Sequence, residues 1–110
     1  MTIERKITKR KPDSVGTILR EEFLKPYGLT QEQLAVAMGV TRTLINELVN
    51  DRRGITIDTA IMLGKVFKCS PQFWLNIYLD SQLWNAFHNP KKVAKFKKVM
   101  SVDDLPHKAA

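Results

Sequence analysis

Three neighbouring polar side chains in this sequence could read the edges of DNA bases. Arg42, Thr43 and Asn46 fall on one side of a helix when residues 42–50 are placed at about 100° per residue. Arginine can make paired hydrogen bonds to guanine, asparagine can do the same with adenine, and the threonine methyl group can contact thymine. A solvated polar face on an ordinary bundle helix is the alternative. The spacing of the surrounding residues favours DNA binding.

The opposite side of the same segment is apolar, which predicts that it packs on another helix. A helix is expected to begin at Gln31, because Thr30 can cap its free N–H groups and Gln33 can complete a capping box. Gly39 can take the positive φ that ends this helix, and Thr41 can cap the next one. Two short helices joined in this way predict a helix-turn-helix, whose second helix, the recognition helix, enters the major groove. The apolar residues of the recognition helix are Leu44, Ile45, Leu48 and Val49.

The residues at the end of the recognition helix could contact the DNA backbone. Asn50 lies on the polar side of the helix, and Asp51-Arg52-Arg53-Gly54 forms a polar turn directly after it. Arg52 and Arg53 are placed to bind phosphates, although a solvated loop would have the same composition. We include Asn50, Arg52 and Arg53 among the candidate DNA-binding residues.

Further helices are expected to position the helix-turn-helix. Asp13 or Ser14 should cap a first helix, which is expected to end before Pro26 because the residue ahead of proline disfavours helical geometry. Thr56 should cap a fourth helix. The residues expected to face the core are Val15, Ile18, Leu19 and Phe23 in the first helix, and Ile57, Ala60, Ile61, Leu63, Gly64 and Phe67 in the fourth.

A fifth helix is predicted over residues 71–87, because Ser70 can cap it and Pro71 suits its first position. Its apolar surface exceeds what one face can bury against four short helices. Most of these side chains should lie in the core, and the excess predicts a second protein surface, most simply a homodimer interface. Asn89-Pro90 should end this helix and begin a short basic segment, Lys91 to Met100.

The basic residues are concentrated at the two ends of the chain. The net charge is +7, yet residues 1–12 hold five Lys or Arg against one Glu, and residues 91–100 hold five Lys and no acid. Because the centre is nearly neutral, the DNA hypothesis depends on individually placed residues rather than on bulk charge. We expect a basic arm (1–12), an all-α, five-helix DNA-binding and dimerisation domain (13–88), and a basic C-terminal extension (89–110). The arm could bind phosphates or serve only as a solubilising tail.

Several functional classes find little support in the sequence. No signal peptide or apolar run long enough to cross a membrane is present, and the single Cys69 fits a reducing cytoplasm. His88 and His107 have no carboxylate or cysteine at metal-ligand spacing, and no phosphate-binding glycine loop occurs. We therefore expect a cytoplasmic protein that is not an enzyme and binds no metal or cofactor.

Residues 30–50, TQEQLAVAMGVTRTLINELVN, resemble the Xre/Cro-like repressors, which have a lambda-repressor-like fold. The later segments NDRRGIT, SPQFWLNI and LW resemble the HigA-type antitoxins of host-inhibition-of-growth toxin–antitoxin modules. The resemblance implies a homodimer that represses its own promoter by binding palindromic double-stranded DNA. It also implies a partner toxin similar to the RelE-type messenger-RNA endonucleases.

Residue by residue, the resemblance implies that Gln31 and Thr41 anchor phosphates while Arg42, Thr43 and Asn46 read bases. The segment from Phe73 to Trp84 corresponds to the dimer-forming helix of the family. Two other functions remain open: a repressor without a toxin partner, and a protein-interaction module that does not bind DNA. The expected dimer contacts are Phe73, Trp74, Ile77, Tyr78 and Trp84.

Overall fold

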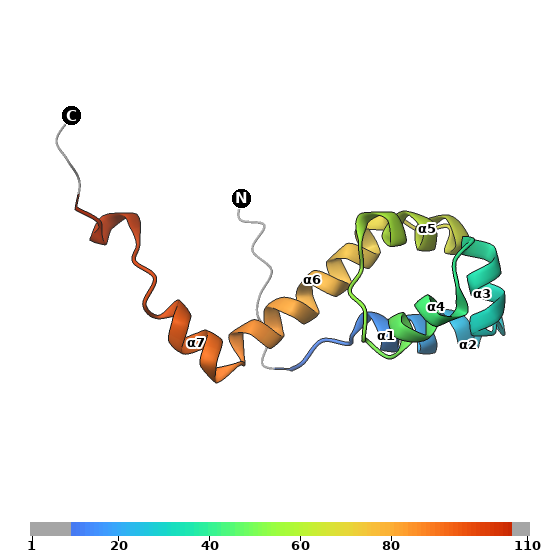
Figure 1. Ribbon diagram of the computed structural model, residues 1–110, viewed down its shortest axis with the longest axis horizontal. Helices are drawn as coiled ribbons and strands as arrows, with labels where there is room; N and C mark the ends of the chain where they lie inside the picture. The colour runs from blue at the N-terminus through green and yellow to red at the C-terminus, as the bar shows by residue number, and fades with distance from the viewer. Residues whose placement is uncertain (1–9, 107–110) are drawn as a thin grey trace, which may run out of the picture.

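The computed structural model describes residues 10–106, and every regular element in that range is helical (Figure 1). The first three elements follow one another without a break and form a single long helix. With the next four helices they make the all-α, five-helix domain predicted from the sequence, followed by short helices in the C-terminal extension. The elements are α1 (Val15–Ile18), η1 (Leu19–Leu24), α2 (Lys25–Tyr27), α3 (Gln31–Met38), α4 (Arg42–Val49), α5 (Ile57–Phe67), α6 (Pro71–Phe87), α7 (Pro90–Phe96) and η2 (Val102–Asp104).

Hydroxyl side chains begin the helices where the sequence predicted them. In each case the oxygen accepts a backbone N–H that has no partner within the helix. Between the alternatives Asp13 and Ser14, the structure selects Ser14. Most of the predicted basic arm, residues 1–12, lies outside the described residues. His107 also lies outside them. The capping residues are Ser14, Thr30, Thr41, Thr56 and Ser70.

The prediction that the first helix ends before Pro26 is wrong. Segment η1 is a π-helix, in which the N–H of Lys25 donates to the carbonyl of Arg20, five residues back. A π-turn is wider than an α-turn, which leaves room for a proline ring that has no N–H to donate. The chain therefore stays helical through Pro26. The helix ends at Gly28, whose φ is 64°.

The core is closed by Trp74 of α6, which is fully buried. Its ring lies 4.8 Å from Phe23 and 6.2 Å from Phe67, centroid to centroid. Helix α5 buries Ala60 and Leu63, but two of its residues expected in the core are exposed, Ile57 by 61% and Ile61 by 40%. They lie at the edge of the helix face that packs on α3 and α6, one turn apart.

Helix α6 extends beyond the bundle and carries α7 at its far end (Figure 1). The molecule is consequently elongated, with principal extents of 61 × 31 × 27 Å. None of the helices in residues 10–106 is both long and apolar enough to cross a bilayer. The same residues contain no group of three or more His, Cys, Asp or Glu that could hold a metal ion.

Candidate nucleic-acid interface

Helix α4 presents its polar and apolar sides as the sequence predicted. Ile45, Leu48 and Val49 are buried, whereas Arg42 and Thr43 are exposed. Within residues 10–106, no hydrogen-bond or ion-pair partner contacts the side chain of Arg42 or Thr43. Their guanidinium, hydroxyl and methyl groups are therefore available to an external ligand.

Asn46 is held in place by a side chain from the preceding helix. Its Nδ2 donates to Oε1 of Gln31 over 3.2 Å. Because the Asn46 amide has a second N–H and an acceptor oxygen, it keeps the groups that pair with adenine. The Gln31 amide likewise keeps its N–H groups, and this contact joins the first residue of α3 to the polar face of α4.

The two helix starts at this surface are fixed by capping hydrogen bonds. Oγ1 of Thr41 accepts from the N–H of Leu44 over 3.2 Å, so its own O–H can still donate to a phosphate. At α3, the Gln33 N–H donates to Thr30 Oγ1 over 3.0 Å, and the Thr30 N–H donates to Gln33 Oε1 over 2.9 Å. This is the capping box predicted from the sequence.

The candidate residues after α4 differ in their side-chain contacts, although all of them were predicted to bind the DNA backbone. Arg53 pairs with Glu47, whose Oε1 lies 2.9 Å from its Nε and 2.8 Å from its Nη2. Arg52 is exposed, and no residue in 10–106 makes a side-chain contact of this type with it. The Asn50 side chain turns back, with Nδ2 donating to the Asn46 carbonyl over 2.9 Å. Of the two arginines in this turn, Arg53 is thus paired with Glu47, and Arg52 has no such partner within residues 10–106.

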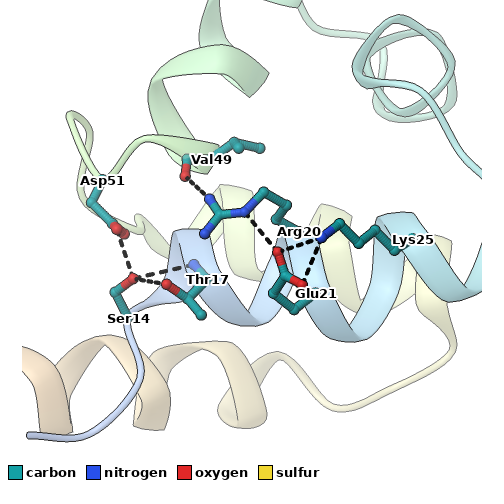
Figure 2. Close-up of polar contacts among 7 residues, drawn as sticks. All are labelled: Ser14, Thr17, Arg20, Glu21, Lys25, Val49 and Asp51. Atoms are coloured by element: carbon teal, nitrogen blue, oxygen red, sulfur yellow. Dashed lines mark hydrogen bonds and ion pairs between the residues drawn. The ribbon is translucent and has the colours of Figure 1, made fainter.

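A carboxylate clamp joins the end of α4 to the start of α1 (Figure 2). Asp51 has φ 57° and accepts the Ser14 hydroxyl at Oδ2 over 2.6 Å. Its Oδ1 accepts the N–H of Gly16 over 2.8 Å. A Cβ at Gly16 would collide with the carbonyl of Val49 and lie 2.8 Å from the Asp51 carboxylate. Sequence reasoning missed this clamp; the signal that could have found it is a glycine in the first turn of a helix, where alanine is favoured.

Arg20 reaches the C-terminal end of α4 from the first long helix (Figure 2). Its Nη1 donates to the Val49 carbonyl over 3.2 Å, while its Nε pairs with Glu21 over 2.9 Å. Lys25 also binds Glu21, and the hydrogen bonds from Lys25 and Arg20 lower the pKa of this carboxyl. A cation at the last carbonyls of a helix suits the helix dipole. Arg20 and the clamp together hold the recognition helix at its far end.

One predicted dimer contact needs correction. Trp74 is completely buried and donates from Nε1 to Cys69 Sγ over 3.2 Å, so it cannot contact a second copy. Phe73 is 40% exposed, although its ring also packs on Trp74. Ile77 and Tyr78 are half-buried against the core.

The outer part of α6 offers other apolar residues. Trp84 is half-buried and stacked on His88 at 3.8 Å between ring centroids, with Lys11 Nζ 5.7 Å from its ring. Leu79 is 49% and Phe87 51% exposed. Neither residue was predicted as a dimer contact, because a helix that is apolar on all sides gives no periodic signal to separate core from interface.

Comparison with known proteins gives consistent results. The helix-turn-helix family profile matches residues 21–74. An uncharacterized HTH-type transcriptional regulator of Haemophilus influenzae is 44% identical over 74% of this chain and 77% of its own length. Antitoxin HigA-1 of Vibrio cholerae is 42% identical over 86% of this chain and 90% of its own. The structure of Pseudomonas aeruginosa antitoxin HigA with higBA promoter has a TM-score of 0.74 at 34% identity, covering 83% of this chain and 98% of that one.

Proposed function

Since the chain belongs to the helix-turn-helix family that includes the HigA-type antitoxins, we propose that it is a cytoplasmic antitoxin that binds and represses its own promoter. The observation that carries the proposal is the shared exposure of Arg42, Thr43 and Asn46 on α4. The side chains on this face can pair with base edges. The contacts at both ends of α4 hold the helix in place. The similarity to a HigA structure that contains promoter DNA supports the same function.

The polar residues around α4 divide into two roles. Arg42, Thr43 and Asn46 read bases in the major groove. Donors at the rim of this face bind phosphates and set the register of the protein on DNA. Arg53 keeps its Nη1 for such a contact even while it is paired with Glu47. The proposed phosphate contacts are Gln31, Thr41, Asn50, Arg52 and Arg53.

The proposed functional form is a homodimer that pairs through α6, within a DNA-binding and dimerisation domain spanning residues 13–88. A two-fold dimer places its recognition helices about 34–36 Å apart, so that each protomer binds one half of a palindrome. The outward residues Leu79 and Phe87 supply apolar area for this contact, next to Phe73, Ile77, Tyr78 and Trp84.

The proposed partner is a protein toxin similar to the RelE-type endonucleases. The 42% identity to Antitoxin HigA-1 over most of both chains supports this partner. A repressor that acts without a toxin is the second candidate, because a relative of 44% identity is named only as an uncharacterized HTH-type transcriptional regulator.

A footprint on the DNA upstream of the gene tests the proposal. The purified protein should protect two half-sites related by a two-fold axis, and an Arg42→Ala variant that unfolds like the parent should protect them poorly. No protection at any salt concentration would favour a protein-interaction module, whereas equal protection of unrelated DNA would show binding without sequence specificity and overturn the role of Arg42, Thr43 and Asn46 as base readers. Co-expression with the neighbouring gene product then separates the two candidates, because an antitoxin should co-purify with it and relieve its toxicity.

A further inference from the structure

Helix α7 lies outside the proposed recognition surface and carries an unbalanced set of charges. Five lysines and no acid occur in residues 91–98, and all five are exposed. Within the described part of the chain, no ion pair or side-chain hydrogen bond involves any of their ammonium groups. The charge of this segment is therefore not neutralised by the rest of the protein.

Three of these lysines share one face of the helix. At about 100° per residue, Lys91, Lys95 and Lys98 fall together, opposite Val93 and Phe96. The turn continues beyond the end of α7, since the Lys98 N–H donates to the Lys95 carbonyl over 3.2 Å. Val93 is half-buried, which places the lysine face on the outside.

The arrangement is unfavourable for an isolated helix. Lys91 and Lys95 are four residues apart, a spacing at which like charges destabilise a helix. Lys91 and Lys92 also lie in the first turn, where the helix dipole repels cations. An external polyanion would relieve both effects.

We propose that the face formed by Lys91, Lys95 and Lys98 binds phosphates of the DNA that flanks each half-site. This inference rests on the proposed function, because α4 must first hold the protein on DNA. Binding by α4 then tethers α7 near the duplex, which raises the effective concentration of its lysines at the phosphates. A contact that is weak by itself can then form.

Helix α7 lies at the opposite end of the molecule from the helix-turn-helix, so it would contact DNA outside the half-site that α4 of the same protomer reads (Figure 1). Helix α6 has 17 residues, which corresponds to a length of about 25 Å. It holds α7 at the far end of a molecule that extends 61 Å (Figure 1). Phosphates follow one another every 3.4 Å or so along each strand, so any duplex that continues past the half-site offers targets. The contact would carry no sequence information.

An anionic membrane surface is the competing ligand for a basic helix. Helices that bind membranes in this way bury a large apolar face, whereas this segment offers few apolar residues: the half-buried Val93 and the exposed Phe96, Val99 and Met100. The chemistry therefore favours phosphates on a polymer that the protein already holds.

The test compares two duplexes by fluorescence anisotropy over a series of salt concentrations. One contains only the two half-sites, and the other adds about 10 bp of arbitrary sequence on each side. The unmodified protein should bind the long duplex with the steeper salt dependence, by about 2.7 in the log–log slope per protomer if three phosphates are contacted. For each protomer, that difference corresponds to about a 40-fold larger loss of affinity between 50 and 200 mM salt, and both protomers of a dimer contribute.

Two charge-matched variants assign the effect to the lysine face. K91Q/K95Q/K98Q should bind both duplexes with the slope of the short one, whereas K65Q/K92Q/K97Q should retain the difference. Equal slopes for the unmodified protein, or equal losses in both variants, would overturn the role of this face. Binding of phosphatidylserine vesicles that only K91Q/K95Q/K98Q loses, with unchanged DNA slopes, would assign it to lipid instead. If the unmodified protein binds the short duplex no better than unrelated DNA of the same length, the proposed function itself is refuted.

Discussion

Arg42 and Asn46, two of the proposed base contacts, differ in how far their side chains are ordered in the free protein. Asn46 is oriented by its hydrogen bond to Gln31, whereas the Arg42 side chain has no partner within residues 10–106. If both contact DNA as proposed, Arg42 should lose more side-chain entropy on binding and gain more new hydrogen bonds. The two residues should contribute to specificity in different ways.

Replacing Arg42 by alanine should cost about 1–3 kcal/mol of binding free energy and relax the preference at one base pair, because a bidentate contact to guanine is lost. Competition binding with every single-base variant of one half-site measures this. A Thr43→Ala variant is the control, since its effect should fall at a different base pair. An equal loss for all sequences after Arg42→Ala would assign Arg42 to the DNA backbone.

Asp51 should matter for stability although it reads no base. Asp51→Ala removes the acceptor of the Ser14 hydroxyl and the Gly16 N–H, and it also places alanine at φ 57°. A loss of about 1–3 kcal/mol in the free energy of unfolding is expected. Asp51→Asn should lose less, because asparagine tolerates this φ and keeps one acceptor. Urea unfolding of the three proteins measures the series, and identical curves would show that the clamp contributes nothing.

At the scale of elements, local signals in the sequence predicted the helix starts well. Hydroxyl caps and the turn at Gly39 depend on a few adjacent residues, and the structure confirms them. The passage of the helix through Pro26 could not be predicted, because it depends on a π-turn that no single residue specifies. The contacts of Arg20 and Asp51 with other elements were missed for a related reason: they join residues about 30 or more positions apart.

The cap of the recognition helix allows a test at this scale. Thr41→Ala should destabilise the protein by about 1 kcal/mol, because the Leu44 N–H loses its acceptor. It should also weaken DNA binding through the loss of the proposed phosphate contact. Thr41→Ser keeps the hydroxyl and should restore both properties in thermal unfolding and anisotropy measurements. Normal DNA affinity for Thr41→Ala would remove Thr41 from the proposed phosphate contacts.

For the whole molecule, the central question is how the proposed homodimer pairs its two recognition helices. The sequence predicted that α6 forms the dimer, but its assignment of individual residues mixed core with surface, as Trp74 illustrates. Burial in the monomer distinguishes the two sets more directly. The exposed Leu79 and Phe87 now become the residues to test.

Leu79→Glu should convert a dimer into a monomer, because it places a charge in an apolar contact that excludes water. Val36→Glu is the matched control, since Val36 is 78% exposed but lies on α3. Sedimentation velocity distinguishes the two forms. A dimeric Leu79→Glu variant with an unchanged dissociation constant would place the interface elsewhere.

The two tryptophans of the chain occupy contrasting environments: Trp74 is sealed in the core, whereas Trp84 is half-buried on the outer part of α6 beside His88. Their intrinsic fluorescence should therefore separate two events in solution. Emission from a Trp84→Phe variant would follow denaturation alone, whereas emission from a Trp74→Phe variant would respond to dilution through subunit dissociation. The protein would thus carry its own optical reporters for unfolding and for dissociation of the proposed dimer, without an added dye.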